Sequence, residues 1–146
     1  DRFGEKPLYT WLHKGTLYFG SEPKFLASLA GSKPQVNEQQ IKRFLTNGYK
    51  SLYKKPATYF EDIHELPAAH FMRLSCSRPT IPFCYWSLNY TPSKITESDA
   101  IDGVREHLEN SIRLRMRSDQ PIAFCLSGGI DSSVITGMSS KLLNCS

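Results

Sequence analysis

The 146-residue sequence has no uninterrupted apolar run that approaches the roughly 18 residues of a membrane-spanning helix. It also lacks the charged and then apolar leader that directs a protein to secretion. Its composition, 40% hydrophobic and 22% charged, is ordinary for a soluble globular protein. We therefore expect a cytoplasmic protein without a membrane partner.

Motifs that bind metals are missing as well. The four cysteines include no CxxC pair, and the four histidines are equally dispersed. These residues are Cys76, Cys84, Cys125, Cys145, His13, His64, His70 and His107. We expect four unpaired thiols and no histidine ligand, with Cys125 acting as a small hydrophobe inside an apolar segment.

No long block of one charge indicates a nucleic-acid surface. The formal net charge is +4, and the basic residues are scattered apart from Arg113, Arg115 and Arg117. Because cations suit the C-terminal end of a helix, we interpret this run as a solvated helix end. Lysines alternate with tyrosines in residues 49–56, a mixture that can bind single-stranded nucleic acid. The stretch is short and unrepeated, so we predict an exposed loop and no nucleic-acid partner.

The first part of the chain alternates strand and helix signals. Aromatic and aliphatic segments at 7–12 and 16–20 flank a short polar turn with a glycine, which predicts a β-hairpin. Pro23 is a favoured first-turn residue of the short helix that follows. Further strands are expected at the end of the segment 60–74 and at 83–86.

A second helix is predicted after Asn37, which forms a capping box with Gln40. Its apolar stripe consists of Ile41, Phe44 and Leu45. Gly31 and Gly48 are typical of the positions just after a helix, so we end the two helices there.

A linker is predicted between residues 87 and 98, where the apolar content falls and Asn, Pro and hydroxyl residues increase. Thr96 and Asp99 form a second capping box, which opens a helix of about five turns. Its apolar residues are Ile101, Val104, Leu108 and Ile112. We therefore predict two domains, at 1–90 and 91–146.

The serine- and glycine-rich turn at 127–133 carries the clearest chemistry. The apolar segment 121–126 before it predicts a buried strand, and apolar residues at helical spacing follow it. A helix N-terminus presents unpaired N–H groups and a partial positive charge, which stabilise phosphate groups. Glycines let a ligand approach the backbone, and Ser127, Ser132 and Ser133 add hydroxyl donors. Either of the last two serines could instead cap the helix.

A capped turn of this kind also occurs without any ligand. It is neither a Walker A loop, which needs a lysine after the second glycine, nor a GxGxxG fingerprint or a GxSxG elbow. It resembles the SGGxDS loop of the PP-loop ATP pyrophosphatases, which adenylate a substrate and release pyrophosphate. With the adjoining Leu126, the nucleotide-binding residues implied by this resemblance are Leu126, Ser127, Gly128, Gly129, Asp131 and Ser132. The implied cofactors are ATP and Mg²⁺, and Asp131 either orients the loop or binds Mg²⁺ through water.

Five further segments resemble, in order and approximate spacing, signposts of the glutamine-hydrolysing asparagine synthetases. They are residues 1–9, 19–24, 66–70, 85–86 and 113–119. The resemblance implies a glutaminase domain of the N-terminal-nucleophile (Ntn) type, an αββα sandwich, followed by an α/β synthetase domain. Residues 1–90 would then be the C-terminal part of the first domain with the linker, an α+β unit. Residues 91–146 would be the first helix, strand and helix of the PP-loop α/β domain.

In that family glutamine is hydrolysed in the first domain, and its ammonia reaches an aspartyl-adenylate made from ATP in the second. The family's nucleophile is a cysteine at the mature N-terminus, which no cysteine here matches. We therefore expect a fragment of a longer enzyme that contains no catalytic residue and is inactive alone. The implied partners are glutamine, ATP, and aspartate or another carboxylate, and a homodimer of the full-length protein is left open. The alternatives are amidation of a cell-surface sugar acid, a β-lactam-type ring closure, and an inactive truncated binding module.

Overall fold

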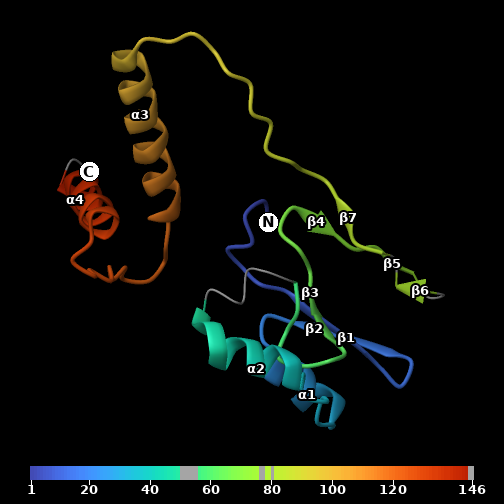
Figure 1. Cartoon of the computed structure of the whole chain (residues 1–146). Helices are drawn as coiled ribbons and strands as arrows, with labels where there is room; N and C mark the ends of the chain where they lie inside the picture. Colours follow the sequence, from blue (N-terminus) through green and yellow to red (C-terminus); the bar gives the residue numbers. More distant parts are fainter. Residues whose placement is uncertain (50–55, 76–77, 80, 145–146) are drawn as a thin grey trace. The chain divides into compact units, whose positions relative to one another are not determined.

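The computed structural model describes residues 1–49, 56–75, 78–79 and 81–144 (Figure 1). The chain divides into two compact units, Asp1–Tyr90 and Thr91–Ser146. The described secondary structure is mixed, with four helices and several short antiparallel strands. No helix within the described ranges combines the length and the apolarity that crossing a bilayer requires. Most of the loop predicted at 49–56 lies outside these ranges, as do Cys76 and Cys145.

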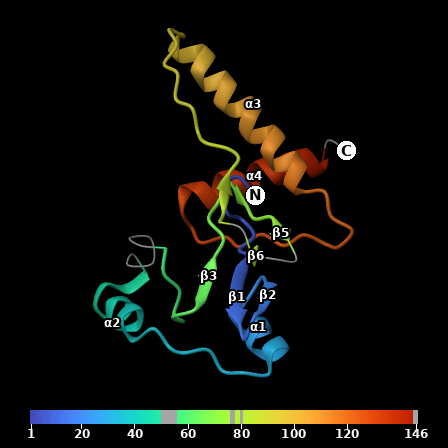
Figure 2. The same ribbon diagram turned by 90° about the vertical axis from the view of Figure 1, so that its right-hand side faces the viewer.

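The predicted hairpin is confirmed. β1 (Tyr9–His13) pairs antiparallel with β2 (Thr16–Gly20). Lys14 and Gly15 connect them with φ angles of 49° and 78°, which are the positive values that a two-residue turn of matching twist requires. β3 (Ile63–Glu65) pairs antiparallel with the other edge of β1, so the strand order is β2-β1-β3 (Figure 2).

The first helix, α1 (Pro23–Ala30), packs against this sheet and completes its core. It ends as predicted at Gly31, which has a φ of 59° and donates its N–H to carbonyls of the last turn. The buried core consists of Leu26 from α1, Trp11 from β1 and Ile63 from β3, which are 0%, 2% and 1% exposed. Burial of each such side chain contributes about 1.5–3 kcal/mol, so this small cluster holds the three elements together.

The second helix, α2 (Glu38–Asn47), begins with the predicted cap. The Asn37 side chain accepts a hydrogen bond from the Gln40 N–H at 2.9 Å. The apolar stripe of α2 is buried only in part, because Leu45 is 76% exposed while Gln40 is buried. The Gln40 side-chain oxygen accepts a hydrogen bond from Arg43 at 2.8 Å instead of reaching back to the cap. The first unit therefore buries Gln40, a polar residue of α2 that lies outside the predicted apolar stripe.

Four two-residue strands follow in the first unit. β4 (His70–Phe71) pairs with β7 (Phe83–Cys84), and β5 (Leu74–Ser75) pairs with β6 (Arg78–Pro79). The strand predicted at 83–86 is therefore confirmed but shorter. These ladders are too short to be stable in isolation, so they depend on the chain segments beside them.

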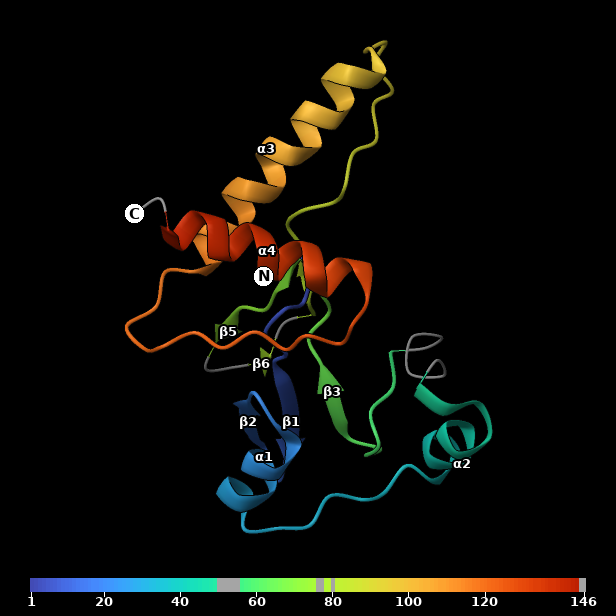
Figure 3. The same cartoon turned by 90° about the vertical axis from the view of Figure 1, so that its left-hand side faces the viewer.

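The second unit is built on the predicted long helix. α3 (Glu97–Arg115) has 19 residues, and Thr96 caps it by accepting a hydrogen bond from the Asp99 N–H at 3.1 Å. Arginines occupy its last turn, where they suit the helix dipole. α4 (Ile130–Asn144) packs against α3 (Figure 3). Ile112, which is 6% exposed, is the buried apolar residue of α3.

The buried strand predicted at 121–126 is wrong. This segment forms no strand, and Ile122, Phe124 and Leu126 are 42%, 37% and 62% exposed. Cys125 is likewise an exposed free thiol and not a buried hydrophobe. A strand must pair its backbone N–H and C=O groups with a neighbouring strand, and none of the described residues pairs with this segment. Its apolar side chains therefore remain uncovered.

Leu26→Ala should destabilise the intact protein by about 2–5 kcal/mol, because it leaves a cavity between α1 and the sheet. Equilibrium urea unfolding followed by tryptophan fluorescence measures the change, since Trp11 lies in the same core. Leu29→Ala is the matched control on the same helix, where the side chain is 67% exposed. It should change stability by no more than about 0.5 kcal/mol. Equal losses in the two variants would contradict this core.

Tyr9 lies opposite Glu65 across β1 and β3. Burial, reinforced by the negative charge of Glu65, raises the pKa of the Tyr9 hydroxyl above its ordinary value. Because the folded pKa exceeds the unfolded one, this contribution to stability is complete below about pH 10 and is lost as the pH rises through the folded pKa. The urea concentration at the unfolding midpoint should therefore fall less steeply in Tyr9→Phe than in the wild type as the pH rises above about 10. Tyr90→Phe, at an 87% exposed position, should keep the wild-type slope; a wild-type slope in Tyr9→Phe would refute the assignment.

Candidate functional site

The serine- and glycine-rich turn leads directly into α4, whose first residue is Ile130 (Figure 3). Gly128 has a φ of 79°, in the left-handed region that side chains with a Cβ disfavour. A Cβ atom at this position would have no protein atom outside its immediate chain neighbours within 4 Å. Glycine is therefore needed here for the backbone conformation, and its bare side faces open space.

The carbonyl of Gly129 is the main acceptor in the turn. The backbone N–H of Ser133 donates to it at 3.1 Å, as the first bond of the helix. The Ser133 hydroxyl donates to the same oxygen at 2.8 Å, and the Ser132 hydroxyl donates at 3.1 Å. The alternative that Ser132 or Ser133 caps the helix is therefore wrong, because both lie within its first turn and donate to a carbonyl instead of accepting from an N–H.

Ser127 joins the two sides of the turn. Its Oγ lies 3.0 Å from the Oγ of Ser132, so that either hydroxyl can donate to the other. It also accepts a long hydrogen bond, 3.4 Å, from the Gly129 N–H. Two hydroxyl groups thus meet at the mouth of the turn, next to the bare backbone of Gly128.

The start of α4 favours negative charge. The first N–H groups of a helix have no intrahelical partners, and the helix dipole adds a partial positive charge. Asp131 lies in this first turn and is exposed. In the described part of the chain, no group of three or more His, Cys, Asp or Glu side chains could hold a metal ion. Asp131 is thus a single carboxylate beside a donor-rich turn.

The structure brings the sequence-predicted site residues together because they are contiguous. Residues 126–131 are exposed, and Ser132 is half-buried. Sequence analysis missed the part that Ser133 plays in holding the Gly129 carbonyl. The available signal was the four-residue spacing from Gly129, because helical serines often donate to the carbonyl four residues earlier.

Comparison with known proteins gives two family matches along the chain. The glutamine amidotransferase domain family matches residues 1–86, and the asparagine synthase family matches residues 103–145. The first match covers more than half of the chain. The serine and glycine turn lies inside the second.

Individual relatives match almost the whole chain. Glutamine-hydrolyzing asparagine synthetase 2 of Bacillus subtilis is 32% identical over 92% of this chain and 19% of its own length. Synthetase 1 of the same species is 28% identical over 97% of this chain and 22% of its own length. Amidase chry2 of Gibberella zeae is 33% identical over 98% of this chain and 21% of its own length.

The chain thus spans about a fifth of the length of the curated relatives it matches. Its two family matches follow each other in the order that the sequence resemblance implies. The chain belongs to the glutamine-hydrolysing asparagine synthetase family.

Proposed function

We propose that the intact protein is a glutamine-dependent asparagine synthetase. It would convert ATP, aspartate and glutamine into asparagine, glutamate, AMP and pyrophosphate through an aspartyl-adenylate. The observation that carries this proposal is the open turn at Gly128, which lies at the start of α4 within the segment that matches asparagine synthase.

We assign residues 1–90 to the C-terminal part of an Ntn-type glutaminase domain with its linker, and 91–146 to the N-terminal part of a PP-loop synthetase domain. The two family matches support this assignment, as does the division of the chain between Tyr90 and Thr91. The three-stranded sheet with α1 on one face is compatible with one sheet and one helical layer of a sandwich. No glutaminase catalytic residue is assigned within the chain.

The turn before α4 would bind the phosphates of ATP. The free N–H groups of the first helical turn and the hydroxyls of Ser127 and Ser132 are donors, and phosphate oxygens are strong acceptors. The open space beside Gly128 leaves room for the phosphates next to the backbone. The proposed nucleotide-binding residues are Leu126, Ser127, Gly128, Gly129, Asp131 and Ser132.

These donors would act mainly on the leaving group. As the substrate carboxylate attacks the α-phosphorus, negative charge increases on the departing pyrophosphate. Donors that are already fixed by the helix stabilise this charge without reorganising. The exposed oxygens of Asp131 fit the ligand preference of Mg²⁺, and Mg²⁺ when bound neutralises phosphate charge. In this proposal the chain's own contribution is to position the phosphates.

Amidation of a different carboxylate is the second candidate. The identities of 33% to Amidase chry2 and 31% to Amidase chyE of Penicillium rubens give it only weak support, because these names specify no carboxylate acceptor. The phosphate-binding turn would do the same work for any carboxylate that is adenylated. The identity of the acceptor therefore separates the two candidates, whereas ATP binding does not.

Gly128→Val in the intact protein should lower the rate of pyrophosphate release about a hundredfold or more, the loss typical when fixed donors no longer reach the developing charge. The valine fills the space beside the turn and disfavours its left-handed φ. The rate is measured by pyrophosphate release, and ATP binding by calorimetry. Gly103→Val is the matched control, because Gly103 lies in α3 with no other protein atom near its Cβ position. Wild-type ATP affinity in a folded Gly128→Val protein would refute the proposed site.

Aspartate should stimulate pyrophosphate release by the intact protein, with one asparagine formed for each pyrophosphate. Glutamate, a uronic acid and a β-amino acid provide the comparison arms at equal concentration. Stimulation by one of these acids and not by aspartate would exclude asparagine synthesis and favour the second candidate.

A further inference from the structure

Ser133 follows directly after the six residues of the SGGxDS pattern and is the fourth residue of α4. Its hydroxyl donates to the Gly129 carbonyl at 2.8 Å, whereas the Ser132 hydroxyl donates to the same oxygen at 3.1 Å. The N–H of Ser133 is a further donor, also at 3.1 Å. Ser133 therefore supplies two of the three bonds that hold this carbonyl, including the shortest.

The direction of the Gly129 carbonyl fixes the direction of a donor. No peptide bond in the described residues is cis, and in a planar trans peptide the C=O and the N–H point in opposite directions. The oxygen of Gly129 points into α4, where it meets Ser133. The N–H of Ile130, which belongs to the same peptide, therefore points out of the helix toward the turn. As the first N–H of the helix, it has no intrahelical partner.

This peptide lies in the part of the turn that rotates most easily. Gly128 and Gly129 precede it, and glycine adopts a wider range of backbone angles than other residues. A rotated peptide would turn the Gly129 oxygen, with its partial negative charge, toward the space beside Gly128 that is proposed for the phosphates. The Ile130 N–H would then be lost to the ligand. A hydroxyl bond of this kind changes such an equilibrium roughly two- to tenfold.

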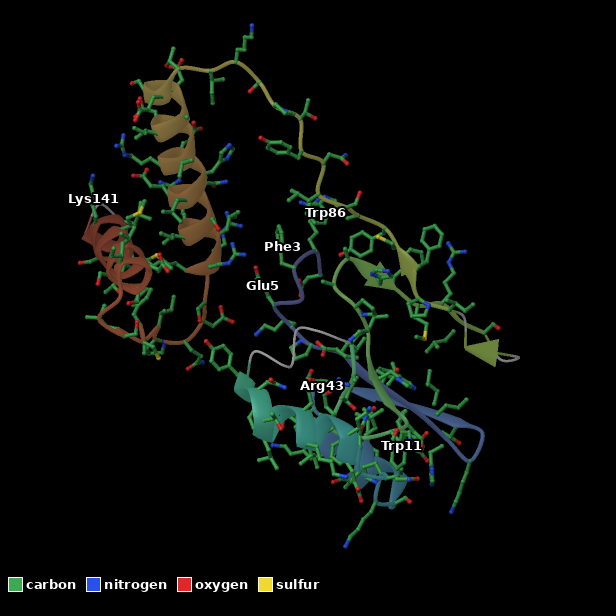
Figure 4. All side chains as sticks on the ribbon, in the orientation of Figure 1. Phe3, Glu5, Trp11, Arg43, Trp86 and Lys141 are labelled. Carbon is green, nitrogen blue, oxygen red and sulfur yellow. The ribbon has the colours of Figure 1, made fainter. Side chains whose placement is uncertain are left out.

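The helix itself does not depend on this bond. Alanine has a higher helix propensity than serine, so that removal of the Ser133 hydroxyl leaves α4 intact. Lys141 in the last turn of α4 places a cation at the negative end of the helix dipole (Figure 4). Asp131 places an anion at the positive end. The bond from Ser133 to Gly129 thus acts on one peptide at the mouth of the turn and not on the formation of the helix.

We propose that Ser133 is a positioning residue of the nucleotide site. Its hydroxyl holds the peptide between Gly129 and Ile130 so that the Ile130 N–H, and not the Gly129 oxygen, faces the phosphates of ATP. Ser133 itself makes no contact with the nucleotide, and its effect on binding is transmitted through the Ile130 N–H. This inference rests on the proposed function, because the ligand is the ATP of the adenylation step.

The first test measures binding of magnesium ATP to the intact protein by calorimetry. Ser133→Ala should weaken the affinity about three- to tenfold. Ser133→Thr keeps a hydroxyl that reaches the same carbonyl and should restore the affinity to within about twofold of the wild type. Thr136→Val is the matched control, because Thr136 donates the same kind of bond, 2.8 Å long, to the Ser132 carbonyl further along α4. Its loss should leave the affinity unchanged.

A second test asks whether the effect passes through the Ile130 N–H. Ile130→Pro removes this N–H, and proline is tolerated at the first position of a helix. It should weaken ATP binding at least as much as Ser133→Ala does. Ile130→Val, at a position that is 82% exposed, keeps the N–H and should bind ATP as the wild type does. In the Ile130→Pro protein, the further change Ser133→Ala should cause no additional loss, because changes that remove the same contact are not additive.

Wild-type affinity in Ser133→Ala would overturn the inference, and so would a loss that Ser133→Thr does not restore. An equal loss in Thr136→Val would overturn it as well, because the effect would then belong to the helix. Additive losses from Ile130→Pro and Ser133→Ala would place Ser133 in direct contact with the nucleotide, again against the inference. In each case the wild-type protein still binds ATP, so that the proposed function stands. Wild-type protein that binds no ATP would overturn the proposed function, and the inference with it.

Discussion

Contact of the Leu26 side chain with Trp11 and Ile63 is the interaction on which the first unit depends. A two-stranded hairpin is marginal alone, and a helix as short as α1 is not stable in water by itself. The hairpin and α1 become stable only when each buries the apolar face of the other. β3 joins the same cluster through Ile63, so that segments distant in the sequence are fixed by one small apolar contact.

Local sequence signals predicted most of the fold where a few neighbouring residues decide the conformation. The Asn37 and Thr96 side chains each accept the predicted N–H bond, although the Gln40 side chain does not complete its capping box. Lys14 with Gly15 makes the predicted turn. Such features need no information from distant parts of the chain. The segment 121–126 shows the opposite case, because a strand exists only when another strand pairs with it. Its apolar composition predicted a requirement for burial and not the presence of a partner.

The residues of the candidate site are consecutive, so the sequence alone groups them in one turn, and the two family matches agree with the resemblance that named it. The directions of its hydroxyl groups were beyond prediction. α4 begins at Ile130, before the serines that could have capped it, and this places Ser132 and Ser133 where they face a carbonyl. The contact of the Arg2 guanidinium with the Trp86 ring, 5.7 Å from its centroid, also escapes sequence analysis, because no local pattern relates positions so far apart.

The Gly129 carbonyl offers two lone pairs, yet three donors converge on it. One donor is therefore in excess, and the Ser132 hydroxyl is the one that also has Ser127 within reach. Because each hydroxyl has one proton and two lone pairs, the Ser132 proton has two acceptors to choose from, the Gly129 carbonyl and the Ser127 oxygen. The Ser133 N–H and hydroxyl bonds to the same carbonyl do not depend on that choice. The Ser132 hydroxyl can therefore turn toward another acceptor while the start of α4 keeps its remaining bonds.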